Sequence, residues 1–238
     1  MKYANVDGQR VEAFPKGRGT CPACSAPTIA KCGRFVMWHW AHEASDACDR
    51  WAETETPWHR AWKNRFPEAW QEVALFDDAL TECHIADVKT QAGLVLEFQR
   101  STIHPDEADA RERFYRRMVW VIDGSRSEFD AMNFNNTRSQ LDSSGLVQFR
   151  WFPRSRIFHR WHRTVPVFVD FGRNFGFWRI LHFEPLTGIG VAGLVDIEGF
   201  VALASSGTTD FSANGGPASP MARPGDSDES ETPGGTAS

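Results

Sequence analysis

Residues 82–101 read Glu-Cys-His-Ile-Ala-Asp-Val-Lys, then Thr-Gln-Ala-Gly, then Leu-Val-Leu-Glu-Phe-Gln-Arg-Ser. Two segments of strand-like composition flank a short turn. A three-residue loop at 91–93 predicts a β-hairpin in which Gly93 takes the left-handed backbone conformation. With this loop, Asp87 faces Glu97 across the ladder, and side-chain alternation places Gln99 on the same face.

The facing carboxylates are the unusual feature of this hairpin. Asp87 and Glu97 repel each other, and both residue types are poor strand formers. A hard divalent cation, which prefers oxygen ligands, is the usual reason to hold such a pair together. The alternative is an ordinary hairpin whose acidic side chains point into solvent.

The same residues carry a resemblance to a known family. Asp87 followed by Glu97-Phe98-Gln99 resembles the core of PD-(D/E)XK nucleases, with Gln99 in place of the usual Lys. The longer strings 86–88 and 97–101 are similar to the competence protein CoiA-like branch, which itself carries Gln at this position.

This resemblance implies a catalytic metal site. It implies Mg²⁺ or Mn²⁺ bound by Asp87, Glu97 and the backbone carbonyl of Phe98, with the Phe98 side chain in the core. Gln99 would orient the attacking water, because an amide can donate and accept hydrogen bonds but supplies no positive charge. Two further expected contacts to DNA phosphates are Arg100 and Ser101. His84 stands where this branch often has Arg, so a contact there is not expected.

A second motif lies near the N-terminus. Cys21-Pro22-Ala23-Cys24 and His39-Trp40-Ala41-His42 are separated by 14 residues. Two thiolates and two imidazoles at about this spacing predict a structural zinc site. The histidine gap is one residue short, so the fourth ligand stays open among His42, Cys48 and Cys32. Buried thiols with unrelated histidines are the alternative. CoiA-like proteins carry a similar Cys-x-x-Cys followed by His-Phe-x-His.

A helix is predicted between these motifs, with Thr56 as N-cap and Pro57 in its first turn. Glu55, His59 and Lys63 follow one another at four-residue spacing. The stripe is either a solvated face with paired charges or, by its resemblance to a motif of CoiA-like proteins, part of the site. The second interpretation makes Glu55 a catalytic residue, and His59 and Lys63 contacts to DNA phosphates or proton carriers.

The periodicities give the order of elements. We expect a strand over 70–76, the hairpin, a helix over 104–117 begun at Ser101 or Thr102, and a buried parallel strand over 118–123. The resulting order αβββαβ is also that of the PD-(D/E)XK core. The expected fold is therefore α/β (α+β), with a zinc-ribbon-like module over 1–50 and a nuclease-like core over 51–124.

The rest of the chain is predicted in less detail. Residues 125–204 are expected to form a β-rich extension that begins with a loop over 124–145. Within it, residues 154–163 mix Arg with aromatic side chains, which suits either single-stranded nucleic acid or an amphipathic helix. Residues 205–238 are rich in Ser, Gly, Pro and Asp and are expected to be disordered.

Composition sets outer limits on function. The net charge is −5, but residues 205–238 hold five acidic side chains and one basic one, so the body is nearly neutral. A near-neutral body neither favours nor excludes DNA. The odd number of cysteines, five, and the tight Cys-x-x-Cys indicate metal or redox chemistry in a reducing compartment. With neither a signal peptide nor a membrane span in the sequence, we expect a cytoplasmic protein without a membrane partner.

The leading hypothesis is a metal-dependent deoxyribonuclease with structural Zn²⁺, acting on DNA that is expected to be single-stranded. The resemblance suggests a role in recombination or competence. The first alternative is a non-catalytic zinc-containing DNA-binding protein with a degenerate nuclease fold, which Gln99 would permit. The second is a regulator that uses only the Cys/His module. The sequence does not determine the oligomeric state or the choice between DNA and RNA.

Overall fold

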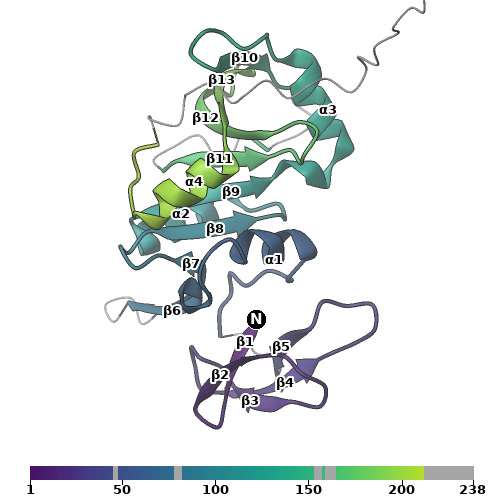
Figure 1. Ribbon diagram of the computed structural model, residues 1–238, viewed down its shortest axis with the longest axis vertical. Coiled ribbons are helices and arrows are strands. Elements are labelled where there is room, and N and C mark those ends of the chain that lie inside the picture. The colour runs from purple at the N-terminus through teal and green to yellow at the C-terminus, as the bar shows by residue number, and fades with distance from the viewer. Residues whose placement is uncertain (45–47, 78–81, 153–156, 159–164, 212–238) are drawn as a thin grey trace, which may run out of the picture.

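The computed structural model describes residues 1–44, 48–77, 82–152, 157–158 and 165–211. The chain forms a small N-terminal sheet and a larger mixed α/β part (Figure 1). Residues 212–238, on which most of the predicted disordered tail falls, and most of the basic and aromatic segment 154–163 lie outside the described residues.

The N-terminal part is an antiparallel half-barrel whose strand order is β2-β1-β3-β4-β5. Its first hairpin turns at Asp7 and Gly8, which both have positive φ, as a two-residue turn requires. Its core is small and centres on Trp40. The five strands are β1 Tyr3–Val6, β2 Gln9–Glu12, β3 Arg18–Thr20, β4 Pro27–Lys31 and β5 His39–His42.

The larger part is one eight-stranded sheet of order β10-β13-β12-β11-β9-β8-β7-β6. Strand β9 runs parallel to both β8 and β11, and the other pairs are antiparallel. The strands are β6 Gln71–Asp77, β7 Glu82–Lys89, β8 Val95–Gln99, β9 Met118–Asp123, β10 Leu146–Arg150, β11 Val167–Asp170, β12 Phe177–Glu184 and β13 Ile189–Val195. The strands of the predicted C-terminal extension thus continue the sheet of the predicted core.

The predicted order αβββαβ is present as α1, β6, β7, β8, α2 and β9. Thr56 caps α1, since its hydroxyl accepts the backbone N–H of His59, and Pro57 opens the helix. Helix α2 begins later than predicted, with His104 as its N-cap, because Pro105 sets the first helical turn. The four α-helices are α1 Pro57–Lys63, α2 Pro105–Tyr115, α3 Glu128–Thr137 and α4 Ile197–Ser205.

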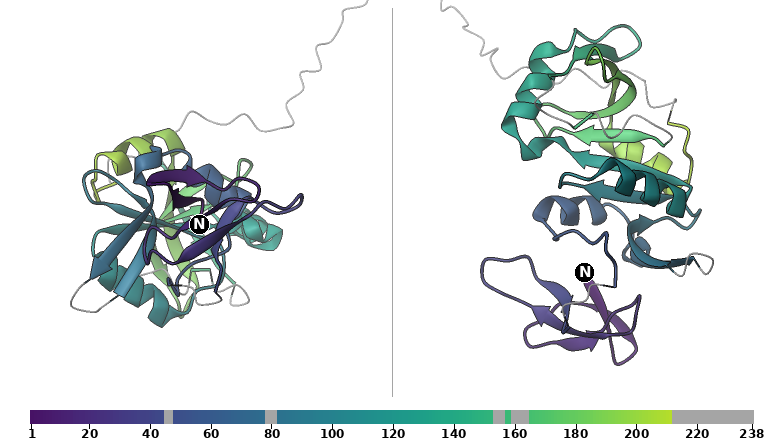
Figure 2. Two further views of the ribbon diagram at one scale, coloured as in Figure 1. Left: turned by 90° about the horizontal axis from the view of Figure 1, so that it is seen from below. Right: turned by 180° about the vertical axis from the view of Figure 1, so that it is seen from behind.

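The helices cover both faces of this sheet (Figures 1 and 2). Helices α1 and α4 pack on one face, where Trp62 stacks on Phe98 and Phe200 lies beside Phe168. Helices α2 and α3 pack on the other, where Trp120 and Phe134 belong to the core. The alternating side chains of β9 supply both cores, which explains its uninterrupted apolar sequence.

Two sequence predictions in this region were wrong. Residues 124–145 are not all loop, because they contain a short 3-10 helix, Gly124–Arg126, and helix α3. Ser127 caps α3, and the few apolar residues Ala131 and Phe134 suffice to anchor it. The ordered part also extends past residue 204, because Phe211 is buried against Phe168 and Phe200.

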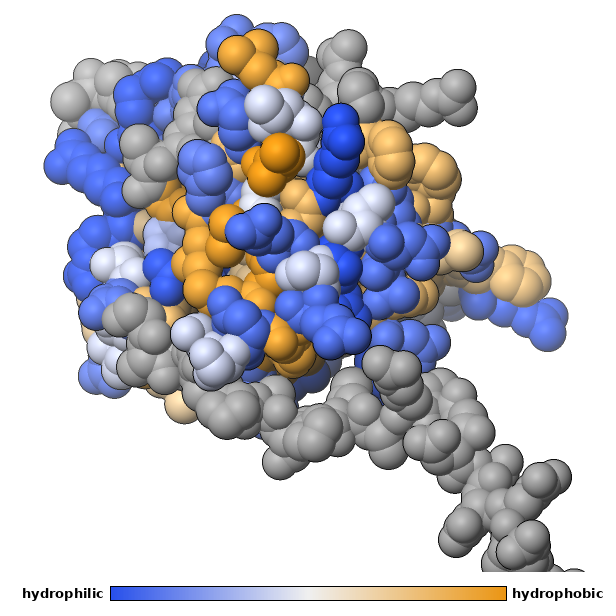
Figure 3. Space-filling model, turned by 90° about the horizontal axis from the view of Figure 1, so that it is seen from above, coloured by the Kyte–Doolittle hydropathy of each residue, from blue (hydrophilic) through white to orange (hydrophobic). Residues whose placement is uncertain are grey.

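The end of the molecule distal to the half-barrel carries a mixture of hydrophobic and hydrophilic residues on its surface (Figure 3). None of the helices in the described ranges is long and apolar enough to cross a bilayer.

Candidate active site and metal centre

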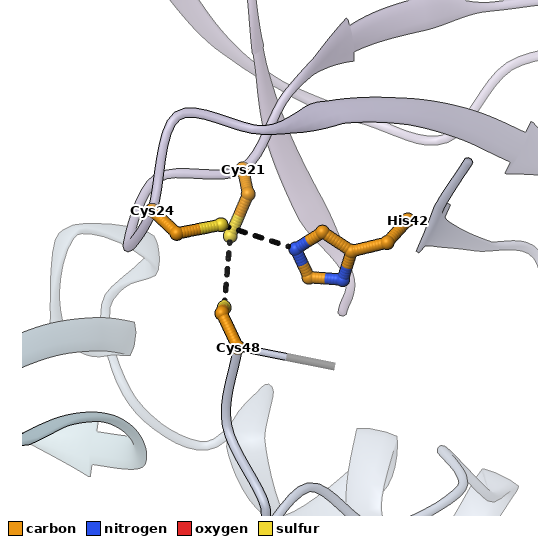
Figure 4. A group of neighbouring side chains, drawn as sticks. All are labelled: Cys21, Cys24, His42 and Cys48. Carbon is orange, nitrogen blue, oxygen red and sulfur yellow. Dashed lines mark hydrogen bonds between the residues drawn. The ribbon is translucent and has the colours of Figure 1, made fainter. Parts of the chain in front are cut away.

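Three cysteines and one histidine meet at the edge of the half-barrel (Figure 4). The ligand atoms of Cys21, Cys24, His42 and Cys48 all lie within 4.8 Å of one another. The Sγ atoms of Cys21 and Cys48 are 3.6 Å apart, and Cys24 Sγ lies 3.3 Å from His42 Nε2. Ligands on a tetrahedral zinc ion would be separated by roughly 3.5–3.8 Å. The donor set and its spacing are therefore compatible with structural Zn²⁺.

The local backbone explains how the two cysteines of the Cys-x-x-Cys motif converge. Cys21 follows β3, and a turn closes when the N–H of Ser25 donates to the Cys21 carbonyl over 2.9 Å. The N–H of Ala23 donates to Cys21 Sγ over 3.4 Å, which fixes the position of this sulfur. Burial and the neighbouring thiols raise the pKa of Cys48, so a cation is needed to hold several thiolates together.

His39 is not part of this cluster, which corrects the predicted ligand set. His39 and His42 are three residues apart on strand β5, and side chains at that separation on a strand point to opposite faces. His39 Nδ1 instead lies 2.8 Å from the carbonyl of Met37. Cys48, one of the two substitutes left open by the sequence, takes its place, and Cys32 stays outside the cluster.

The residue after Cys48 ties the metal cluster to the large sheet. Asp49 accepts a hydrogen bond from the N–H of Ile85 and lies 2.8 Å from His84 Nδ1. Trp51 stacks on the His84 ring. His84 is thus a buried structural residue on β7. Cys48 of the cluster is three residues from Trp51, which lines the second site.

The second site is a pocket beside the predicted hairpin. It is lined by Trp51, Ala52, Glu53, Thr54, Glu55, His59, Ile85, Asp87, Glu97, Phe98 and Arg111. The hairpin closes as predicted, with a 2.9 Å hydrogen bond from the Thr90 N–H to the Leu94 carbonyl and φ +80° at Gly93. The ladder between β7 and β8 pairs only Val88 with Leu96 and Lys89 with Val95, so the strands separate at the carboxylates.

Both carboxylates are held where the strands separate. Glu97 Oε1 accepts the backbone N–H of Asp87 over 3.2 Å, and Asp87 Oδ2 accepts the N–H of Phe98 over 2.9 Å. Burial and the nearby Asp87 raise the pKa of Glu97 to about 8, against the opposing effect of Arg111. Burial likewise raises the pKa of Asp87, although Lys63 and His59 oppose it. This pair would gain from an added cation.

Two cations approach the carboxylates from opposite faces of the sheet. Arg111 of α2 lies 3.0 Å from Glu97 Oε2 and also donates to the Trp51 carbonyl. Lys63 of α1 lies 3.8 Å from Asp87. The sequence prediction missed Arg111, which is one of two arginines in α2 and which no pattern distinguishes from Arg113.

Lys63 occupies a different place from the one expected of a phosphate contact. Its side chain is 2% exposed and its ammonium lies 2.6 Å from Glu55 and 2.8 Å from Glu72. Burial opposes the charge, but Glu72, Asp87 and Glu55 together raise the pKa of Lys63. Lys63 therefore acts within the protein as the counter-ion of three carboxylates.

Glu53, which the sequence prediction did not select, joins several site residues. One carboxylate oxygen accepts from the Gln99 amide and from the Ser101 hydroxyl, and the other lies 3.4 Å from His59 Nε2. Burial opposes ionisation of Glu53, but His59 and Ser101 outweigh it and lower its pKa to about 2. The same pairing raises the pKa of His59 despite its burial.

The remaining predicted residues lie around this network. Glu55 lines the pocket, but its two carboxylate oxygens form ion pairs with Arg60 and Lys63. Gln99 is 2% exposed and does not line the pocket, since its amide donates to Glu53 and Ser101. Arg100 lies 3.4 Å from the buried Asp123. The Phe98 side chain packs in the core beside Trp62, as predicted.

Comparison with known families gives one match, over the part of the chain that holds the Cys/His cluster. Residues 5–50 match the family described as Competence protein CoiA, N-terminal domain. The match ends two residues after Cys48 and thus covers all four members of the cluster. No curated protein and no solved structure matched the chain.

Proposed function

We propose that the protein is a metal-dependent nuclease that hydrolyses phosphodiester bonds in DNA at the pocket between β7 and β8. The observation that carries this proposal is the carboxylate pair, half-buried Asp87 and buried Glu97, facing one pocket at the point where their strands separate. The order of elements around the pair and the CoiA match over residues 5–50 also support it.

The carboxylates fit a hard cation. The Asp87 and Glu97 oxygens, with the Phe98 carbonyl as a third ligand, are the donor types that Mg²⁺ or Mn²⁺ prefers. When bound, the ion would supply the positive charge that makes a water nucleophilic and stabilises the leaving oxyanion. The raised pKa of Glu97 supports this assignment. It shows that the ionised carboxylate lacks sufficient positive charge around it, and a bound cation would supply that charge.

His59 is the residue best placed to carry a proton. Its Nδ1 lies 2.8 Å from the Thr56 hydroxyl, which orients the ring, and its Nε2 faces Glu53. The ionised Glu53 stabilises the imidazolium that forms when His59 accepts a proton from the attacking water. Gln99 then acts through Glu53, whose position it fixes, and Lys63 and Glu55 keep the charge around Asp87 balanced.

In this assignment zinc has a structural role only. Cys21, Cys24, His42 and Cys48 would hold Zn²⁺, which offsets the small core of the half-barrel. The residue pair Cys48 and Asp49 then links the filled cluster to β7.

The engagement of Gln99 favours a second candidate. Where nucleases of this superfamily carry Lys, this chain has an amide that is buried and bonded to Glu53. A DNA-binding protein without catalysis would tolerate this arrangement. The two carboxylates argue against it, since acidic groups next to phosphates weaken binding.

One assay separates the two candidates. Cleavage of single- and double-stranded DNA, with RNA as a further substrate, is measured with Mg²⁺ or Mn²⁺ for the wild type, Asp87→Ala and Glu97→Ala. Glu198→Gln, an exposed carboxylate paired with Arg65, is the matched control. We expect the two site variants to lose at least 100-fold in rate while each retains one zinc per chain. Absence of wild-type cleavage on every substrate, together with clear DNA binding, would support the non-catalytic candidate.

A further inference from the structure

The half-barrel segregates its charge. Residues 13–42 contain four basic side chains and no acidic one, in a chain of net charge −5. The four are Lys16, Arg18, Lys31 and Arg34. This stretch lies between Glu12 and Glu43, and its excess of positive charge suits an anionic partner.

Strand register gathers part of this charge on one face. Arg18 of β3 pairs with Ile29 of β4, and Lys31, two residues further along β4, pairs with His39 of β5. Opposed residues share a face, so Arg18, Lys31 and His39 lie on the same side of the sheet. The opposite side carries Trp40 of the core and His42 of the metal cluster. The basic side is therefore the outer one.

Exposed aromatic side chains lie in the connection between β4 and β5, next to this face in the sequence. In the connection between the strands Phe35 is 92% exposed and Trp38 is 46% exposed. The Arg34 guanidinium lies 5.6 Å from the centre of the Phe35 ring, and the Trp38 indole N–H donates to the Gly33 carbonyl over 3.3 Å. The hydrogen bond between Trp38 and Gly33 thus joins the two ends of the connection, and Arg34 places a positive charge beside Phe35.

This loop adjoins the helix that lines the carboxylate pocket. Arg60 of α1 donates to the Trp38 carbonyl over 3.1 Å, and its neighbour in sequence, His59, lines the pocket. The β4–β5 connection extends toward α1 in both the front and the rear views (Figures 1 and 2). A strand leaving the pocket along α1 would meet Phe35 and Trp38.

We propose that the outer face of β3–β5 and its aromatic loop bind single-stranded nucleic acid. Arg18, Lys31, Arg34 and His39 would contact phosphates, and Phe35 and Trp38 would stack on unpaired bases. This inference rests on the proposed function, because nucleic acid is the partner that the nuclease pocket would act on. It adds that the bound form is single-stranded.

The chemistry of the surface selects this partner over others. Base stacking on exposed rings combined with a basic track is the pattern of single-strand recognition, and in a duplex the base faces are not available. A purely apolar protein contact would not require the basic side chains that accompany these rings. Arg18 is already paired with Glu43, so Lys31 and Arg34 are the charges to test.

The test measures binding of a fluorescent oligonucleotide to the full chain with Asp87→Ala throughout and no added divalent metal, after zinc content is checked. We expect Phe35→Ala combined with Trp38→Ala to weaken single-strand binding at least fivefold, with the salt dependence unchanged. Lys31→Ala and Arg34→Ala should each weaken binding and lower the slope of log affinity against log salt by about 0.7.

Matched controls lie outside the half-barrel, in the large sheet. Leu186→Ala removes an equally exposed apolar side chain, 95% exposed, between β12 and β13, and Arg173→Ala removes an exposed charge between β11 and β12. Both should bind as the parent does. Equal binding by parent and aromatic variant would overturn the inference, as would a duplex of the same length binding as tightly as the single strand.

Other outcomes are separable. Loss of binding to anionic lipid vesicles in the aromatic variant, with single-strand binding intact, would overturn the inference in favour of a membrane surface. Cleavage by the wild-type protein with unaffected binding in all surface variants would leave the proposed function standing and the inference refuted. Absence of cleavage, together with the expected losses of binding, would refute the proposed function and support the inference.

Discussion

The carboxylates of Asp87 and Glu97 accept backbone N–H groups across their hairpin, in place of the carbonyl groups of a regular ladder. The N–H of Asp87 donates to the Glu97 carboxylate over 3.2 Å, and the Asp87 carboxylate accepts the N–H of Phe98 over 2.9 Å. The two strands therefore separate without leaving these backbone donors unsatisfied, and the space opened is the pocket. The acidic pair thus both shapes the site and supplies its negative charge.

This arrangement predicts a pH dependence for Mg²⁺ binding. The pKa of Glu97 is raised to about 8, so below that pH the carboxyl is mostly protonated and a metal must displace the proton. The apparent affinity for Mg²⁺ should fall as the pH is lowered from about 8, by up to tenfold per pH unit, and should level off above 8. Titration calorimetry at pH 6, 7, 8 and 9 measures this.

Glu97→Gln provides the comparison. Its amide cannot ionise, so its weak binding should show a much flatter dependence on pH over the same range. An affinity of the wild type that is the same at pH 6 and pH 9 would contradict the assignment of Glu97 as a metal ligand.

Glu72 connects the half-barrel to the large sheet and should make the protein sensitive to acid. Its carboxylate accepts the backbone N–H groups of Lys2 and Tyr3 and pairs with Lys63 at 2.8 Å. Burial opposes its ionisation, but Lys63 and these donors lower its pKa to about 2. A depressed pKa means that the stabilisation is complete above the ordinary value near 4.5 and is lost as the pH falls from 4.5 to 2.

The corresponding variant is Glu72→Gln. It leaves Lys63 without one of its buried partners and should lower the free energy of unfolding at pH 7 by about 3 kcal/mol. Urea unfolding at pH 7 and pH 3.5 should show that the variant loses less stability on acidification than the wild type. Glu68→Gln, an exposed neighbour, is the control, and equal acid losses in wild type and Glu72→Gln would count against this account.

The choice of zinc ligands can be tested with the two histidines of one strand. His42→Ala and Cys48→Ser remove cluster members and should reduce the zinc retained per chain well below one, because tetrahedral Zn²⁺ needs all four ligands. His39→Ala should retain one zinc, because His39 faces the other side of β5. Metal analysis after dialysis against a weak chelator gives the answer.

The three variants also control for one another, since His39 and His42 are the same residue type on the same strand. Retention of zinc by Cys48→Ser together with loss from His39→Ala would restore the ligand set that the sequence spacing suggested.

Glu53 should affect catalysis through His59. Glu53→Gln keeps the size of the side chain but removes the charge that raises the pKa of His59. We expect the single-turnover cleavage rate to fall 10²–10⁴-fold, the range of general acid–base contributions, while DNA affinity changes little. The acidic limb of the rate profile should also move to lower pH, because His59 would lose its raised pKa.

Thr137→Val, which removes a hydroxyl bonded within α3, tests for general destabilisation. A rate equal to the wild type in Glu53→Gln would remove Glu53 and His59 from the mechanism while leaving the metal assignment intact.

Sequence pattern sufficed where the forces are local. The hairpin loop depends on Gly93, the start of α1 on Thr56 and Pro57, and the turn of the first hairpin on Asp7 and Gly8, all within a few residues. Strand β9 was predictable because burial on both faces demands an apolar run. Helix α3 was missed because its polar sequence hides the two buried residues that anchor it.

The order of elements, the facing of Asp87 toward Glu97 and the Cys-x-x-Cys turn were thus determined by the sequence itself, since propensity, periodicity and turn chemistry act over short distances. Tertiary structure decided the rest. Cys48 completes the metal cluster although it lies between the half-barrel and the large sheet in the sequence. Glu53 lies outside any helix, and Arg111 reaches Glu97 only because α2 packs across the sheet. No periodicity along the chain encodes such long-range contacts, which arise only when distant elements bury their apolar faces together.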